Sequence, residues 1–64
     1  MRIPKEEKLS FIGWLETEGF QLKSERGALI LHQGFSTYGI FTDRDGCKIP
    51  LQIKGLYKKF KEQQ

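Results

Sequence analysis

The 64-residue sequence contains one cysteine, one histidine and two prolines. A single cysteine, Cys47, excludes a disulfide within the chain, and one thiol with one imidazole cannot form a zinc site without carboxylates. The longest uninterrupted apolar run, residues 28–31, is too short to span a bilayer or to form the core of a signal peptide. We therefore expect a cytoplasmic protein without a metal, a cofactor or a membrane segment, in which Cys47 is a small core residue.

The chain is also too short for two domains, a cofactor-binding domain or a deep substrate cleft. Hydrophobic residues make up 38 % of the sequence and charged residues 30 %. This composition is too apolar for a disordered chain and too polar for a membrane protein. We expect a single small domain over residues 1–64, whose stability depends on good caps and turns or on a partner, because its core is small.

The positive charge is concentrated near the C-terminus. Residues 48–64 contain five lysines and one glutamate, a net charge of +4, and residues 1–47 contain six basic and seven acidic residues, a net charge of −1. No arginine lies in the basic segment to bind a phosphate or a guanine through two parallel hydrogen bonds. The asymmetry indicates a negatively charged partner, which is either a nucleic-acid backbone or an acidic protein surface.

A helix is predicted from Pro4 to Gly19. Proline suits the first helical position, and glycine suits the left-handed conformation that commonly follows the last helical residue. Two glutamates in the first turn favour the positive end of the helix dipole. One face of this helix is apolar and consists of Leu9, Phe11, Ile12 and Leu15.

Three or four strands are expected between this helix and residue 53. The Asp45-Gly46 pair predicts a type I′ hairpin turn, in which both central residues have positive φ. Residues 47–53 alternate between apolar and polar, which predicts a strand with one buried face. Pro50 places this strand at a sheet edge because proline cannot donate a hydrogen bond to a neighbouring strand.

A second helix is predicted over residues 54–63, with its lysines beside an apolar face. A run of strands between two helices indicates an α+β fold. We expect a three- to four-stranded antiparallel sheet, flanked by an N-terminal and a C-terminal helix that pack on one face.

The lysines of the second helix are the leading candidates for a binding site. Amines in a row neutralise phosphates and release counterions, which gives affinity independent of sequence, although a solvated helix face has the same pattern. We expect a small non-enzymatic protein that contacts a nucleic-acid backbone, with RNA favoured. The expected phosphate contacts are Lys54, Lys58 and Lys61, with support from Lys48 and Lys59.

An alternative is a small protein-binding regulator or inhibitor of the kind that mobile elements encode. Its anchors would be the aromatic residues Trp14, Phe35 and Tyr38. The edge strand at 47–53 would then extend a partner's sheet or form a homodimer. The glycine-aromatic segment 34–41 as a whole is otherwise expected to pack in the core with bends at its glycines, rather than to stack bases on exposed rings.

The sequence contains no recognisable catalytic constellation. His32, the only imidazole, has no orienting partner that the sequence identifies, and it lies 15 residues from Cys47. The carboxylates Glu16 and Glu18 fall on different helix faces. Residues 43–46 resemble the start of a calcium-binding loop but lack the later ligands, so we assign them to a turn.

Three features of the sequence resemble those of HicA-type toxins, which are short, basic, α-β-β-β-α domains similar to double-stranded-RNA-binding domains. They are Gly19-Phe20 at the end of the first helix, Gly27 eight positions after Gly19, and Ile49-Pro50 in the last predicted strand. The resemblance implies such a fold and binding of structured RNA across a phosphate-facing helix. Ala28-Leu29 stands where these toxins carry Ser-His with the catalytic histidine, so RNA cleavage is not implied.

Overall fold

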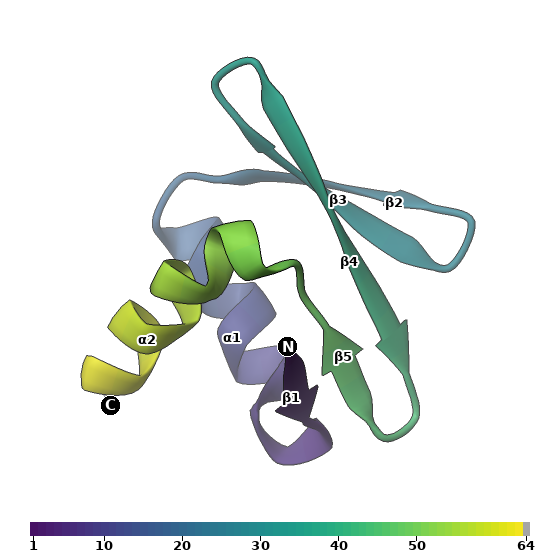
Figure 1. Ribbon diagram of the computed structural model, residues 1–64, viewed down its shortest axis with the longest axis vertical. Coiled ribbons are helices and arrows are strands. Elements are labelled where there is room, and N and C mark those ends of the chain that lie inside the picture. Colours follow the sequence, from purple (N-terminus) through teal and green to yellow (C-terminus); the bar gives the residue numbers. More distant parts are fainter. Residues whose placement is uncertain (64) are drawn as a thin grey trace.

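A computed structural model describes residues 1–63 and contains a five-stranded antiparallel sheet with two helices (Figure 1). The strands are β1 (Arg2–Pro4), β2 (Gln21–Glu25), β3 (Ala28–Gln33), β4 (Ser36–Asp43) and β5 (Gly46–Lys48). The helices are α1 (Lys5–Thr17) and α2 (Lys54–Glu62), and a short 3-10 turn, η1 (Leu51–Ile53), precedes α2. The strand order is β1-β5-β4-β3-β2. The predicted α+β fold is confirmed, with five strands instead of three or four.

The additional strand is β1, at the very start of the chain. It pairs with β5 so that Ile3 lies opposite Cys47. Beyond the strand, the Ile49 backbone N–H donates to the Met1 carbonyl oxygen over 2.8 Å, and the N-terminal ammonium donates to the Ile49 carbonyl oxygen over 3.0 Å. Three residues are too few for a two-residue alternation to be recognised in the sequence, so β1 could not be predicted.

The predicted strand over residues 47–53 is wrong beyond Lys48. The chain leaves the sheet at Ile49, and residues 51–53 form η1. Pro50 has an extended backbone with φ −70° and lies between the end of β5 and η1, so it does not occupy an edge strand. Because β1 covers β5, the two edges of the sheet are β1 and β2. The segment 47–53 therefore offers no free strand edge for the expected homodimer or for extension of a partner's sheet.

The tight turns differ from their predictions. Arg26 and Gly27 both have positive φ, 49° and 80°, so the type I′ turn connects β2 to β3. The predicted hairpin between β4 and β5 is confirmed, but its turn is not type I′, because Gly46 has φ 143° and Asp45 has no positive φ. The Asp45 backbone N–H donates instead to the Asp43 carboxylate over 2.8 Å, which stabilises a turn of another type.

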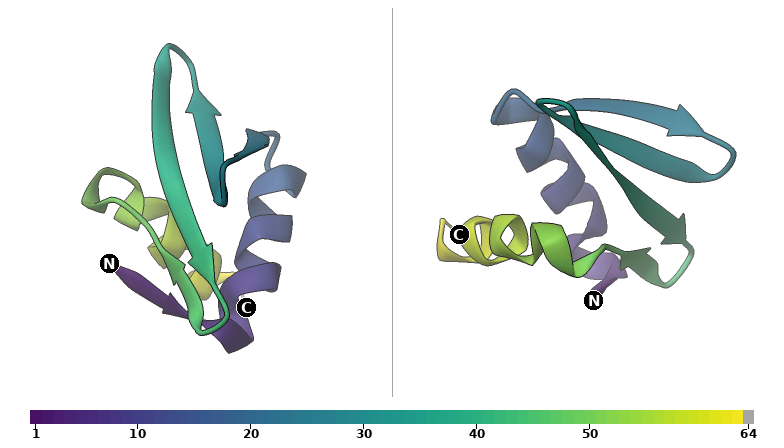
Figure 2. Two further views of the ribbon diagram at one scale, coloured as in Figure 1. Left: turned by 90° about the vertical axis from the view of Figure 1, so that its right-hand side faces the viewer. Right: turned by 45° about the horizontal axis from the view of Figure 1, so that its top comes forward.

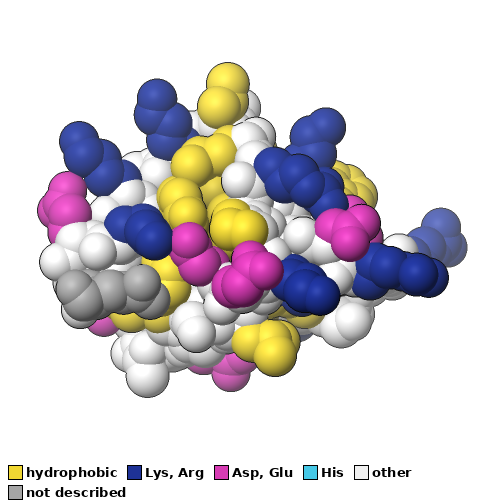
Figure 3. Space-filling view, turned by 90° about the horizontal axis from the view of Figure 1, so that it is seen from below, with side chains coloured by type: hydrophobic (Ala, Val, Ile, Leu, Met, Phe, Trp, Pro, Cys, Tyr) yellow, Lys and Arg dark blue, Asp and Glu magenta, His cyan; other side chains and the backbone are white. Residues whose placement is uncertain are grey.

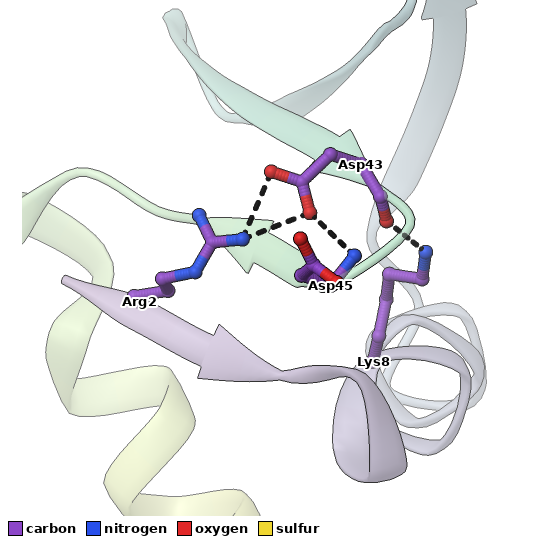
Figure 4. A network of polar contacts seen from close by, with 4 residues as sticks. All are labelled: Arg2, Lys8, Asp43 and Asp45. Atoms are coloured by element: carbon purple, nitrogen blue, oxygen red, sulfur yellow. Dashed lines mark hydrogen bonds and ion pairs between the residues drawn. The ribbon is translucent and has the colours of Figure 1, made fainter.

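The same Asp43 joins three segments (Figure 4). Its carboxylate oxygens accept hydrogen bonds from Arg2 Nη2, each over 2.9 Å, and this contact ties β1 to the β4–β5 turn. Lys8 of α1 donates to the Asp43 carbonyl oxygen over 2.6 Å. The Arg2 contact and the Asp45 N–H lower the pKa of the Asp43 carboxyl below its ordinary value.

The start and end of α1 follow the sequence closely. Pro4 is the residue before the first helical turn, and Gly19 has φ 93° in the left-handed cap that was predicted. The Gly19 backbone N–H donates a hydrogen bond to the Glu16 carbonyl oxygen, and the Phe20 backbone N–H donates to the Leu15 carbonyl oxygen. The apolar face is narrower than predicted, since Leu9 is 77 % exposed.

The strand register separates the sheet into two faces. Leu31 pairs with Tyr38 and Leu29 with Ile40, so these side chains share one face, which we call the inner face. The other face, which we call the outer face, carries alternate residues of β3 and β4: Ala28, Ile30, His32, Thr37, Gly39 and Phe41. Both helices pack against the inner face, because the core combines residues of α1, α2 and the inner positions of the strands.

The hydrophobic core is small and largely aliphatic, with aromatic rings between the helices. It consists of nine buried side chains: Ile3, Phe11, Leu15, Leu31, Ile40, Cys47, Ile49, Ile53 and Phe60. The prediction that Cys47 is a core residue is confirmed, since it is fully buried. Neither helix of residues 1–63 is long and apolar enough to cross a membrane. The β2–β3 hairpin extends away from both helices (Figure 2).

Candidate nucleic-acid interface

The helix α2 is amphipathic, and its apolar face packs on α1. The Phe60 and Tyr57 rings lie with their centroids 5.3 Å and 5.6 Å from that of Phe11, both in edge-to-face arrangements. Trp14 adds a further contact with Phe60 at 5.8 Å. Because this face is fixed against α1, the lysines of α2 are left on its solvent-exposed sides.

Two of the five candidate lysines are paired with carboxylates of α1. Lys61 Nζ lies 3.0 Å from Glu7 Oε2, and Lys59 Nζ lies 3.8 Å from Glu18 Oε1. Both ammonium groups remain about half exposed, so these are surface ion pairs of small energy. Their positive charge is nevertheless partly neutralised by the neighbouring helix.

Glu7 is the most constrained of these carboxylates. The Tyr57 hydroxyl donates to Glu7 Oε1 over 2.6 Å, and Lys61 donates to Oε2 over 3.0 Å. These hydrogen bonds, with that of Tyr57 the largest cause, lower the pKa of the Glu7 carboxyl. The reciprocal effect raises the pKa of Tyr57 to about 12, because the hydroxyl proton is held by an anionic acceptor.

The remaining three lysines, Lys48, Lys54 and Lys58, are exposed and have no ion pair among residues 1–63. We call them the unpaired lysines. Lys54 and Lys58 are four residues apart on α2, which is about 6 Å along the helix axis. Lys48 lies outside α2, on the outer face of the sheet opposite Phe41. The predicted set is therefore divided between two elements.

The face seen from below carries charge of both signs (Figure 3). Basic side chains are spread over its periphery, acidic side chains lie between them, and hydrophobic surface is visible in the middle. No single basic patch covers this face. The unpaired lysines are therefore better candidates for phosphate contacts than the whole set of five.

The aromatic anchors of the alternative protein-binding site do not come together. Trp14 is half-buried, and its indole N–H donates to Gln63 Oε1 over 2.8 Å. Tyr38 is half-buried on the inner face opposite Leu31. Phe35 is fully exposed at the turn between β3 and β4, at the top of Figure 1. Of the three, Phe35 alone has its ring free for a partner.

The prediction that the aromatic residues of 34–41 pack in the core is wrong for Phe41. Its side chain is 62 % exposed on the outer face, opposite Lys48 and Ala28. The signal was present in the alternation along the strand. Tyr38 and Ile40 share one face, so Phe41 must lie on the other, together with Gly39.

The residues considered for catalysis or metal binding lie apart. His32 is half-buried on the outer face between Gln21 and Thr37, neither of which is a carboxylate. Among residues 1–63, no group of three or more His, Cys, Asp or Glu side chains is placed to hold a metal ion.

Comparison with protein-family models, curated proteins and solved structures gives no significant match. The resemblance to HicA-type toxins therefore stays a prediction, and the function has to be inferred from the chain's own residues.

Proposed function

We propose that this protein is a non-enzymatic nucleic-acid-binding protein that contacts the phosphate backbone, with RNA favoured, through the unpaired lysines. The observation that carries the proposal is the exposure of Lys54 and Lys58 on the same helix without an ion pair among residues 1–63. Such ammonium groups can neutralise phosphates directly, which releases the counterions that are condensed on the nucleic acid. The sequence resemblance to HicA-type toxins points to the same ligand.

The pairing with α1 alters the expected roles of the lysines. Lys61 and Lys59 are engaged by Glu7 and Glu18, so each would have to leave a carboxylate before it binds a phosphate. We therefore assign the main phosphate contacts to the unpaired lysines and a weaker, supporting role to the paired ones. This order reverses the prediction for Lys48 and Lys61.

The test is a salt titration of the affinity for a labelled RNA. The double variant Lys54→Gln/Lys58→Gln should bind more weakly, and its plot of log affinity against log salt should be shallower by about 1.4 to 1.8, since each lost phosphate contact removes about 0.7 to 0.9. The matched control is Lys23→Gln, which removes an exposed charge on the edge strand β2. This variant should change both the affinity and the salt slope by less than the double variant does. An affinity without salt dependence, or equal slopes for the double variant and the wild type, would refute the proposal.

The alternative, a protein-binding regulator, is favoured by the full exposure of Phe35 at a hairpin tip. An exposed phenylalanine at a turn is a suitable anchor for a pocket on another protein. Capture from a lysate with and without nuclease separates the two functions. Binding that survives nuclease and is lost in Phe35→Ala supports the alternative, whereas nuclease-sensitive binding that Phe35→Ala retains supports the nucleic-acid ligand.

A further inference from the structure

The outer face of the sheet is not covered by either helix. Both helices pack on the inner face, and in the left view of Figure 2 no helix crosses in front of β4. The outer positions of β3 and β4 nearest Phe41 are Ala28, Ile30 and Gly39, which are apolar, whereas His32 and Thr37 lie further along the same face. The ring of Phe41 is therefore an exposed aromatic surface supported by a sheet.

Gly39 determines where this ring lies. A Cβ atom added to Gly39 would be 3.4 Å from Cε2 of the Phe41 ring, so the ring leans along the strand over the glycine. The sheet thus supports the ring on one side, and 62 % of the side chain is exposed. An aromatic ring held in this way loses little conformational entropy when another flat group stacks on it.

A groove of about 180 Å³ adjoins the ring. It is lined by Gly39, Phe41, Lys48, Ile49 and Pro50. The groove exists because β5 ends at Lys48 and the chain then diverges from β4 toward η1 (Figure 1). Its walls are one aromatic ring, aliphatic groups and a single ammonium group.

The charge beside the groove is positive. Lys48 lies directly opposite Phe41 in the register and has no ion pair among residues 1–63. Asp43, two residues further along β4, is engaged by Arg2 at 2.9 Å and so contributes little negative charge of its own. An aromatic platform with a neighbouring unpaired cation matches a flat base attached to a phosphate.

We propose that this groove binds an unpaired base of a single-stranded nucleic acid, which stacks on Phe41 while the adjacent phosphate contacts Lys48. The proposal rests on the proposed function and deepens it by naming the form of the ligand. Pro50 in the groove wall is followed directly by η1 and α2. Lys54, four residues after Pro50, is therefore about 8 Å from it along the chain. A single-stranded nucleic acid that leaves the groove in this direction runs toward Lys54 and Lys58, the other two unpaired lysines.

The decisive experiment measures the affinity for a short labelled single strand and for its duplex. Phe41→Leu keeps an apolar side chain and removes the ring, Phe41→Tyr keeps the ring, and Phe35→Ala removes the more exposed ring at the distant hairpin tip. We expect Phe41→Leu to weaken binding of the single strand by about 5- to 150-fold, the usual range for one stacked base. Phe41→Tyr and Phe35→Ala should bind as the wild type does, and the duplex should be unaffected by Phe41→Leu.

The salt titration separates stacking from phosphate contact. Phe41→Leu should lower the affinity without changing the salt slope, whereas Lys48→Gln should lower the slope by about 0.7 on a single strand. RNA and DNA strands of the same sequence identify the sugar: tighter binding of RNA supports an RNA ligand, and equal binding supports recognition of any unpaired base. Phe41 is exposed, so its variants should keep the wild-type urea midpoint.

The outcomes distinguish this proposal from the one on which it rests. If Lys54→Gln/Lys58→Gln weakens binding but Phe41→Leu does not, the lysine interface stands and the groove proposal is overturned. Equal loss for single strand and duplex in Phe41→Leu also overturns it, because a paired base cannot stack there. If neither set of variants changes the affinity, both proposals fail.

Discussion

Gly46 is the residue at which a single methyl group should most damage the fold. It is buried at the start of β5, opposite Pro4, with φ 143°. A Cβ atom there would overlap the carbonyl oxygen of Ile3 and come within 3.2 Å of the Lys5 backbone nitrogen. These contacts are backbone atoms of β1 and of the start of α1, so no flexible side chain can move aside.

The magnitude of Gly46→Ala follows from two costs. A residue with a side chain in this backbone region costs about 1–3 kcal/mol. Displacing β1 also exposes Ile3, which is fully buried, at about 1.5–3 kcal/mol. The sum is about 2.5–6 kcal/mol, which is comparable with the at most about 3–5 kcal/mol of stability that so small a core usually supplies. Gly46→Ala should therefore be largely unfolded.

Urea denaturation followed by circular dichroism measures this, with Gly27→Ala as the matched control. Gly27 also has positive φ, 80°, but no atom lies within 4 Å of an added Cβ, so its cost should be about 1–2 kcal/mol. Ile3→Ala should cost about 2–5 kcal/mol alone and much less in the Gly46→Ala background, if any fold remains there, because β1 is already displaced. Equal destabilisation by Gly46→Ala and Gly27→Ala would show that the close approach of β1 is wrong.

Four further predictions concern the charged and titratable residues. Glu7→Gln should release Lys61 and steepen the salt dependence of nucleic-acid binding by about 0.7 to 0.9; an unchanged slope would show that Lys61 is not held back by Glu7. Because the folded pKa values of Glu7 and Asp43 lie below their ordinary values of 4.5 and 3.8, their stabilisation should be complete above those values and be lost on further acidification, and urea midpoints that stay constant into acid would contradict this. An absorbance titration should find the Tyr57 phenol ionising at a pKa of about 12, with a lower value in Glu7→Gln, and stability should fall as pH rises from about 10 through 12. Cys47, whose thiol is fully buried and has its pKa raised by burial, should react with a thiol reagent only on unfolding, and rapid labelling of the native protein would contradict its place in the core.

The elements with local signals were predictable from the sequence. The end of α1 at Gly19 and the position of α2 follow from capping residues and helical spacing, and both are confirmed. The mistakes involve contacts between distant segments. β1 is too short to show a period, and the turn at Gly46 is shaped by β1, which packs on it from 43 residues earlier in the chain, so the Asp-Gly pair adopts a conformation that the local signal does not predict.

The candidate site shows the same division. The excess of lysine near the C-terminus is a property of composition and is visible in the sequence. The sequence does not reveal which of these lysines are paired, because the partner of Lys61 is Glu7, 54 residues away, and the partner of Lys59 is Glu18. Phe41 could have been assigned to the outer face by alternation alone, but its exposure depends on the absence of a helix there.

The pairing by α1 has a consequence for where the positive charge acts. Glu7 and Glu18 oppose the lysines near the C-terminal end of α2, so the uncompensated charge remains at its first two turns, on Lys54 and Lys58. That end follows the groove beside Phe41, where Lys48 adds a third unpaired charge. The sheet and the helix therefore contribute to one candidate surface only at this junction. A ligand that uses both the ring and the charges has to cross it, which a flexible single strand can do more readily than a rigid duplex.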